Sequence, residues 1–85
     1  MYTLLITPDA IKTLKRMPAN TARLIRSKID RVAQDPMAPN NNVRALQGRD
    51  GYRLRVGDWR VIYELNHDRR TLTVLRIGPR GGVYA

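Results

Sequence analysis

The first half of the chain combines a short apolar stretch with two stretches of helical period. Residues 1–6 are rich in Leu, Ile and Tyr, which favours a β-strand. The tetrapeptide TPDA at residues 7–10 is typical of a helix start, because it offers a threonine N-cap, a proline in the first turn and an acidic side chain near the positive end of the helix dipole. Apolar residues recur at helical spacing up to Pro18 and again from there to Pro36, so the pattern predicts two helices in an antiparallel hairpin.

The second half of the chain follows a different pattern. Residues 35–42 are rich in proline and asparagine and predict a loop. Beyond Gly48, apolar and polar residues alternate with period two, which predicts three strands, at residues 52–56, 59–65 and 71–77. This order predicts an α+β fold in a single domain over residues 1–85. The expected arrangement is an N-terminal strand, an antiparallel helical hairpin and a three-stranded antiparallel meander (β-α-α-β-β-β), with the helices packed on one face of the sheet.

The dipeptide Gly-Asp at residues 57–58 sets the register of the first two of these strands. A two-residue turn that begins with glycine joins neighbouring strands as a tight hairpin, and this one places Arg55 opposite Arg60. Successive side chains of a strand point to opposite faces, so the apolar residues share the side that the helices cover. The other side is expected to carry Arg53, Arg55 and Arg60.

The last predicted strand adds to this arrangement. Leu75 and Ile77 are expected on the apolar side, which would turn Arg76 to the side of the other arginines. Like charges that face one another across strands are unfavourable by some tenths of a kcal/mol up to about 1 kcal/mol, so a bound anion would stabilise the cluster. The same sequence is compatible with a solvated basic surface in which Glu64 pairs with Arg60 or Arg76.

The composition favours a polyanionic partner. Lys and Arg total 16 residues against 7 Asp and Glu, which gives a formal net charge of +9. Thirteen of the cations are arginine, whose planar guanidinium group binds phosphate through two hydrogen bonds and stacks on bases. A surplus of this sign attracts nucleic acids and acidic proteins.

The composition also excludes several kinds of chemistry. The chain has no cysteine, which rules out disulfides, thiolate nucleophiles and thiolate metal sites. Its one histidine, His67, is expected in the turn between the last two strands, away from the arginines, so we predict neither a metal centre nor a cofactor. No apolar run approaches the roughly 20 residues that cross a bilayer, and no signal peptide is visible. We therefore expect a cytoplasmic protein without membrane contact.

Two stretches of the chain match a known pattern. YRLRVGDWRVIYEL at residues 52–65 and TLTVLRIGPRGGVY at residues 71–84 resemble the RelE/ParE superfamily of bacterial toxins. Members of that superfamily also begin with a strand and a helical hairpin and carry a loop like the one between Pro39 and Gly48. The resemblance covers nearly the whole chain and implies the toxin of a type II toxin–antitoxin system, closest to the RelE-like messenger-RNA interferases.

For RelE-like members the resemblance implies an endoribonuclease that cleaves messenger RNA in the ribosomal A site. The ribose 2′-hydroxyl would attack the adjacent phosphodiester to give a 2′,3′-cyclic phosphate, without a metal. Carried over by position, the catalytic residues are Arg53, Arg55, Arg60, Arg80 and Tyr84. The first three suit stabilisation of the phosphate, and Arg80 suits the leaving oxygen.

The sequence departs from the family pattern at positions 53 and 55, where members often have lysine and this chain has arginine twice. Arginine is a poor general base because its pKa lies above 12. Either Tyr84 accepts the proton or the enzyme is slow. The tail also has Gly81 and Gly82 where basic or acidic residues are common.

The resemblance implies partners and two other functions as well. The expected partners are a cognate antitoxin, acidic and wrapped around the toxin, the ribosome with its messenger RNA, and operator DNA reached through the antitoxin. In ParE-like members the same fold poisons DNA gyrase and cleaves nothing. A third function is that of a DNA-binding corepressor that acts only with its antitoxin. The set of arginines with Tyr84 favours the nuclease, whereas the glycines of the tail and the missing lysines favour the other two.

Overall fold

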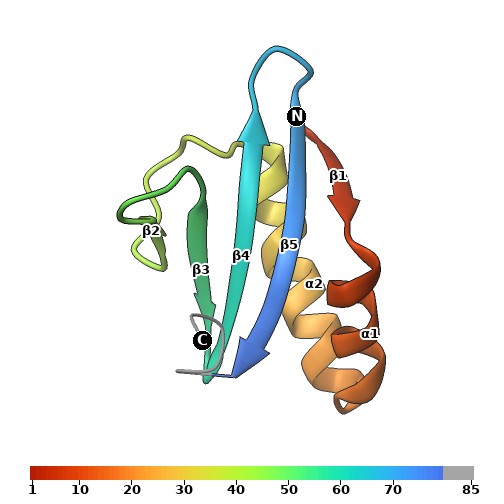
Figure 1. Ribbon diagram of the computed structural model, residues 1–85. Coiled ribbons are helices and arrows are strands. Elements are labelled where there is room, and N and C mark those ends of the chain that lie inside the picture. Colours follow the sequence, from red (N-terminus) through yellow and green to blue (C-terminus); the bar gives the residue numbers. More distant parts are fainter. Residues whose placement is uncertain (80–85) are drawn as a thin grey trace.

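The first part of the chain folds as its apolar pattern predicts. In the computed structural model, which describes residues 1–79, this part forms one strand and two helices (Figure 1). Their bounds are Thr3–Ile6 for β1, Pro8–Arg16 for α1 and Ala19–Gln34 for α2. Thr7 caps α1, since its Oγ1 accepts a hydrogen bond from the backbone N–H of Ala10 at 3.3 Å. The same hydroxyl donates to the carbonyl oxygen of Leu75 at 2.9 Å and ties the start of α1 to the last strand.

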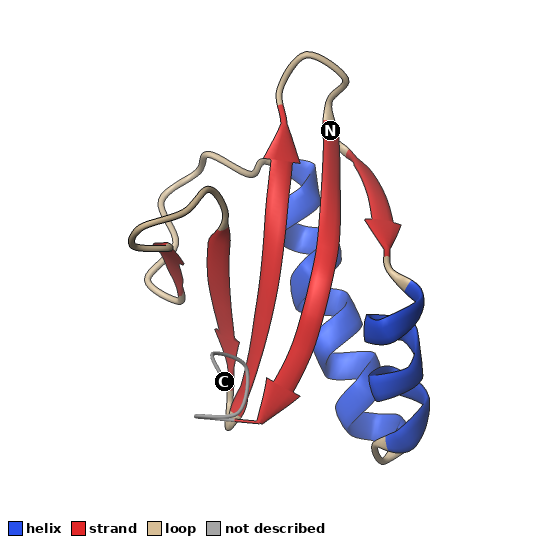
Figure 2. Cartoon of the chain, viewed as in Figure 1, coloured by secondary structure: helices blue, strands red, loops and turns tan. Residues whose placement is uncertain are grey.

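The remaining strands complete one five-stranded sheet. Their bounds are Val43–Ala45 for β2, Tyr52–Val56 for β3, Trp59–Asn66 for β4 and Thr71–Pro79 for β5. The strand order is β1-β5-β4-β3-β2, in which β1 runs parallel to β5 and the other neighbours are antiparallel (Figure 2). The predicted α+β class and the meander of β3, β4 and β5 are confirmed.

The strand β2 is an addition to the predicted fold. Residues 43–45 pair with β3 at the edge of the sheet, next to the proline-rich and asparagine-rich segment that was expected to be a loop. A strand of three residues is too short to show alternation, so the period of the sequence does not reveal it. Val43 packs against the core, and this burial together with the pairing to β3 holds the strand in place.

The hairpin of β3 and β4 has the predicted register. Gly57 adopts a positive φ of 57°, as the first position of a tight hairpin turn requires. Arg55 lies opposite Arg60, and Leu54 lies opposite Val61. The glycine of the turn and the alternation of the two strands were therefore sufficient to place every side chain of this hairpin on its correct face.

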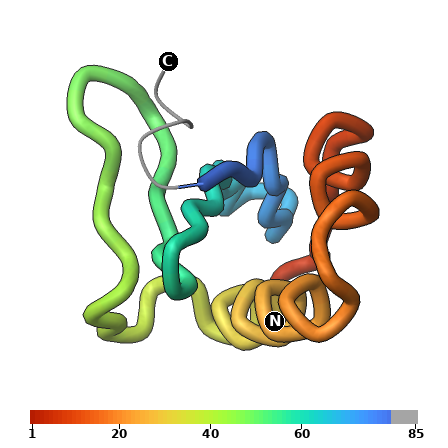
Figure 3. The backbone as a smooth tube through the Cα atoms, turned by 90° about the horizontal axis from the view of Figure 1, so that it is seen from below, coloured from red at the N-terminus to blue at the C-terminus, as the bar shows by residue number. Residues whose placement is uncertain are grey.

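The core lies between the helices and one face of the sheet. Figure 3 shows α2 along one side of the sheet and the loop between β2 and β3 projecting away from α2. The buried side chains of α2 meet those of the sheet, namely Ile25, Ile29, Val32 and Ala33 with Leu54, Val61, Tyr63, Leu72 and Val74. The prediction that the helices pack on one face is confirmed. Within residues 1–79, no helix is both long enough and apolar enough to span a bilayer.

A β-bulge in β5 changes one predicted position. Ile62 of β4 lies opposite Arg76, whereas the next residue, Tyr63, lies opposite Val74, so Leu75 is an extra residue without a facing partner. The prediction that Leu75 joins the core face is wrong, because Val74 takes that place. Beyond the bulge, Ile77 is buried in the core as predicted. Since Val74 and Leu75 are both apolar, the pattern of the strand does not show where the register shifts.

The largest fully buried side chain of the core is that of Tyr63, which is 1% exposed. Its ring stacks on that of Tyr52, with 5.5 Å between centroids and an interplanar angle of 21°. The hydroxyl is buried without a hydrogen-bond partner among the described residues. Burial, with a smaller contribution from Tyr52, raises the pKa of Tyr63 to about 12.

This buried hydroxyl predicts a loss of stability in alkali. The unfolded chain releases the tyrosine proton near pH 10, whereas the folded chain holds it to about pH 12, so stability is lost as the pH rises through this window. In urea unfolding between pH 8 and 12, Tyr63→Phe should lose less stability above pH 10 than the wild type. At pH 8 it should be at least as stable, because it lacks the unpaired hydroxyl. Tyr52→Phe is the matched control and should keep the alkaline loss; identical curves for wild type and Tyr63→Phe would contradict this prediction.

Candidate functional site

The sheet face opposite α2 carries a set of arginines that we call the arginine face. Two rows of facing residues cross the strands there. The first row runs from β2 to β5 through Arg44, Arg53, Ile62 and Arg76. The second row runs from β3 to β5 through Arg55, Arg60 and Gly78. Alternation places both rows away from the core, since their chain neighbours Leu54, Val61 and Ile77 are buried in it.

Three of the five predicted site residues lie together on this face. Arg53, Arg55 and Arg60 come from β3 and β4 and occupy the positions that the hairpin register predicts. The other two, Arg80 and Tyr84, lie outside the residues that the structure describes. The described part of the site is thus an arginine cluster built on the hairpin of β3 and β4.

Two further arginines belong to the same face. Arg76 points away from the core, as the sequence predicts, and lies opposite Ile62. Arg44 was not among the predicted site residues, because β2 was not recognised as a strand. Its pairing with Arg53 brings it onto the face. The only sequence signal for Arg44 is its place between the apolar residues Val43 and Ala45, which is too short to carry a prediction.

The arginine face brings like charges opposite one another. Arg55 faces Arg60, and Arg44 faces Arg53, and each such pair is unfavourable by up to about 1 kcal/mol. Within residues 1–79, Glu64 forms no ion pair with Arg60 or Arg76, although it shares their face; an ion pair of 3.3 Å joins Arg26 to Asp30 on α2 instead. The interpretation of the face as a neutralised, solvated surface therefore lacks its expected salt bridge.

The middle of the arginine face is shielded from solvent. Ile62 is 1% exposed although it lies outside the core cluster, and the register places Arg53 and Arg76 on its two sides. Arg53 and Arg60 are only partly exposed, and the Nε of Arg53 and the Nη1 of Arg60 are buried. Nη1 of Arg60 has no hydrogen-bond partner in the described part of the chain. A guanidinium group in such surroundings attracts an anion more strongly than one in bulk water.

The one histidine lies at the other end of the sheet. His67 follows β4, whereas Arg60 is near its start, about 23 Å away at 3.3 Å per strand residue. The Nδ1 of His67 lies 2.6 Å from the hydroxyl oxygen of Tyr2, and the two rings meet edge to face. His67 therefore has a structural partner and does not reach the arginine face.

The chemistry of the arginine face follows from its donors. Five guanidinium groups can bind a phosphodiester and stabilise added negative charge, but arginine does not accept a proton at neutral pH. Among residues 1–79, no three His, Cys, Asp or Glu side chains are grouped so that they could hold a metal ion. The arginines of this face can thus supply electrostatic stabilisation, and a reaction that needs a proton acceptor would require another group.

Comparison with known proteins identifies the family of the chain. Residues 4–84 match the family model of the ParE toxin of the type II toxin–antitoxin system parDE. The chain belongs to the RelE/ParE family of toxins. Over 76 residues the toxin is 29% identical to the RelE1 protein of Methanocaldococcus jannaschii, a match that covers 87% of this chain and 84% of that protein.

Solved structures of the same family have the same fold as the toxin. The archaeal RelE–RelB complex from Pyrococcus horikoshii contains a chain that is 30% identical, with a TM-score of 0.82, and the match covers 96% of this chain and 98% of the other. The intact Escherichia coli RelBE toxin–antitoxin complex matches with a TM-score of 0.79 at 20% identity, over 93% and 96% of the two chains. The five-stranded sheet with two helices on one face is therefore a RelE-type fold.

Proposed function

We propose that the toxin inhibits translation by cleaving messenger RNA in the ribosomal A site. The observation that carries this proposal is the buried Nη1 of Arg60, which has no hydrogen-bond partner within residues 1–79 and belongs to an arginine that faces a second one, Arg55, across the hairpin. A phosphodiester would provide the missing acceptor and relieve the repulsion between Arg55 and Arg60. The similarity to RelE toxins supports a nuclease over a simple anion-binding module.

The proposed reaction is a transfer within the RNA chain and needs no metal. The 2′-oxygen of one nucleotide attacks the phosphorus of the next phosphodiester, and the bond from phosphorus to the 5′-oxygen breaks. The products are a 2′,3′-cyclic phosphate and a 5′-hydroxyl. Arg53, Arg55 and Arg60 act as donors to the phosphate oxygens, where negative charge grows in the pentacoordinate transition state.

Proton transfer at the two ends of the reaction is assigned to the tail. Tyr84, in its phenolate form, is the proposed acceptor of the 2′-hydroxyl proton, and Arg80 is proposed to stabilise the leaving 5′-oxygen, which takes up a proton from water. The arginine face supports this division, because its described members stabilise charge and cannot accept a proton at neutral pH. Both tail residues lie beyond residue 79, so their roles are tested by substitution and not by distances in the structure.

The proposed partners follow from the same charges. RelE relatives from Pyrococcus horikoshii and Escherichia coli were solved in complexes with the antitoxin RelB. We infer that an acidic antitoxin covers the arginine face of this toxin and blocks access of RNA to Arg60. The ribosome is the proposed site of action, and its RNA offers the counter-charge that a protein with a net charge of +9 attracts.

A primer-extension assay on translating ribosomes tests the proposed function. The wild-type toxin should produce cuts within A-site codons, and the upstream fragments should end in a 2′,3′-cyclic phosphate. The control is a preparation with Arg60→Gln, in which the cuts should be much weaker. Intact message at toxin concentrations that stop translation would refute the nuclease.

Inhibition of DNA gyrase is the second candidate function. It is favoured by the match of residues 4–84 to the ParE model and by the arginines that replace lysine at positions 53 and 55. A supercoiling assay with purified gyrase separates the two candidates. Inhibited supercoiling together with intact message would select this function over the first.

A further inference from the structure

A pocket opens beside the arginine face, between β2, β3 and the loop that joins them. Its volume is about 480 Å³, and its lining includes Arg44, Gln47, Arg49 and Arg53. Arg53 belongs to both the pocket and the arginine face, so the two sites are continuous. Neither Arg49 nor Gln47 is assigned a role by the proposed catalytic mechanism.

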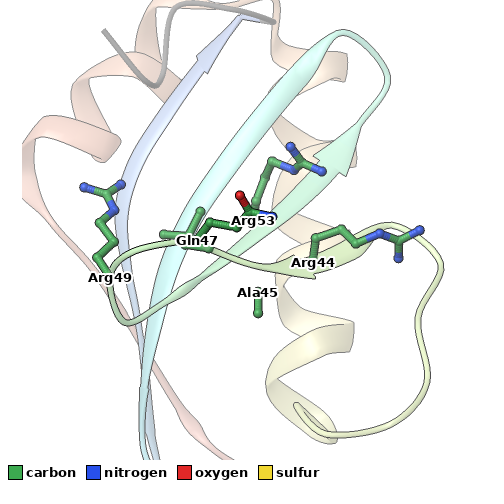
Figure 4. Close-up of a pocket in the computed structure, with 6 residues that line it drawn as sticks. Arg44, Ala45, Gln47, Arg49 and Arg53 are labelled. Carbon is green, nitrogen blue, oxygen red and sulfur yellow. The ribbon is translucent and has the colours of Figure 1, made fainter.

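The side chains of the pocket are spread out and do not converge on one point. Figure 4 shows Arg49 on one side of Gln47 and the guanidinium groups of Arg53 and Arg44 on the other. Arg44 and Arg49 are exposed and have no ion pair with another described residue, and Arg44 uses one donor to bind the carbonyl oxygen of Val43 at 3.2 Å. An arrangement of this kind fits an anion that carries a charge at each repeat of a chain better than it fits a single phosphate ion.

We propose that this pocket binds the phosphodiester backbone of single-stranded RNA at nucleotides that flank the reacting phosphate. The inference rests on the proposed RNA substrate, which must leave the arginine face in both directions because it is a polymer. The pocket lies where that chain would pass Arg53 toward the sheet edge at β2. Its contacts strengthen binding and take no part in bond breaking.

Charge and hydrogen bonding favour RNA over an acidic peptide as the occupant. The cations of the pocket are all arginine, whose fork matches phosphate oxygens with two donors. Gln47 has an amide that both donates and accepts, as the edge of a base requires. An acidic peptide offers carboxylates at varied spacing and no base edge.

The salt dependence of RNA binding tests the proposal. The probe is a fluorescein-labelled single-stranded RNA with 2′-O-methyl riboses, which cannot be cut, and binding is followed by anisotropy over a salt series. A plot of log K against log salt has a negative slope, and each lost phosphate contact reduces the magnitude of that slope by about 0.7 for a single strand. The double variant Arg44→Gln/Arg49→Gln should therefore reduce the magnitude by about 1.4. The matched control is Arg23→Gln/Arg31→Gln on α2, with the same charge change at exposed positions, and should keep the wild-type slope. On ribosomes the single variant Arg49→Gln, which leaves the arginine face intact, should raise KM and leave kcat unchanged.

Each outcome of this test supports or overturns the binding of RNA in the pocket. A slope of the double variant equal to that of the wild type or of the control would overturn the proposal, as would a wild type that does not bind the RNA. If the double variant binds RNA as the wild type does but binds a polyglutamate peptide more weakly, the occupant of the pocket is an acidic protein and not RNA. If the double variant shows the expected change of slope but the wild type never cuts messenger RNA, the nuclease is refuted and the pocket remains assigned to RNA.

Discussion

Replacing Arg60 by glutamine is expected to slow RNA cleavage roughly 10²- to 10³-fold, the loss typical of removing one donor to a developing negative charge. The Nη1 of Arg60 is buried and has no hydrogen-bond partner within residues 1–79, so water competes little with a phosphate for it. Arg55 faces it across the hairpin, which allows both guanidinium groups to act on one phosphate. Single-turnover cleavage on programmed ribosomes measures the effect.

Two further variants separate the role of Arg60 from net charge. Arg60→Lys keeps the charge but loses the planar fork, and should recover only part of the rate. Arg23→Gln removes the same charge from an exposed position on α2, behind the sheet, and should cleave at the wild-type rate. Thermal unfolding should find Arg60→Gln as stable as the wild type, because the change removes a buried donor without a partner. Equal losses of activity in Arg23→Gln and Arg60→Gln would contradict the assignment.

Gly51→Ala is expected to destabilise the fold by about 3 kcal/mol. Gly51 has a φ of 120°, and a Cβ added there would lie 3.1 Å from Leu46 Cδ1 and 3.1 Å from the carbonyl oxygen of Tyr63. The carbonyl belongs to β4, so it can give way by a few tenths of an ångström only if the backbone of the sheet is distorted. The backbone N–H of Leu46 donates to the carbonyl oxygen of Gly51 at 3.0 Å, so strain here also displaces the loop that carries Arg49. For a domain of this size the midpoint of thermal unfolding should fall by roughly 4–8 °C for each kcal/mol lost.

The matched control for this prediction is Gly48→Ala in the same loop. Gly48 also has a positive φ, of 76°, but no atom lies within 4 Å of an added Cβ. Its substitution should therefore reduce the free energy of unfolding by only about 1 to 2 kcal/mol, the cost of a left-handed backbone for a residue with a Cβ. If the two variants unfold at the same temperature, the close approach of Gly51 to β4 has no energetic consequence and the prediction is wrong.

The register of the central hairpin was predictable because two local signals agree there. The Gly-Asp turn fixes which residues face one another, and the alternation of β3 and β4 fixes which face is buried. The sequence therefore predicts correctly the face on which Arg53, Arg55 and Arg60 lie. The helix boundaries were predictable for a similar reason, since Thr7, Pro18 and Pro36 act on the chain locally.

Features that depend on distant parts of the chain were not predictable in this way. The strand β2 exists because Val43 reaches the core and Arg44 pairs with Arg53, and neither contact leaves a pattern in a segment of three residues. The bulge at Leu75 follows from how β5 fits between two neighbours. Both features bear on the site, because the first adds Arg44 to the arginine face and opens the pocket beside it.

The place of β5 in the sheet has a consequence for how the toxin is made. This strand lies between β1 and β4, and the hydrogen bond from Thr7 to Leu75 joins residues 68 positions apart. A nascent chain that still holds β5 inside the exit tunnel lacks both the strand that joins β1 to β4 and the strand that pairs with β4 at Arg60. The described elements can assemble only after almost all of them have been synthesised, and such long-range pairing folds slowly compared with local helical contacts. A chain whose β5 is still inside the ribosome therefore lacks the complete arginine face.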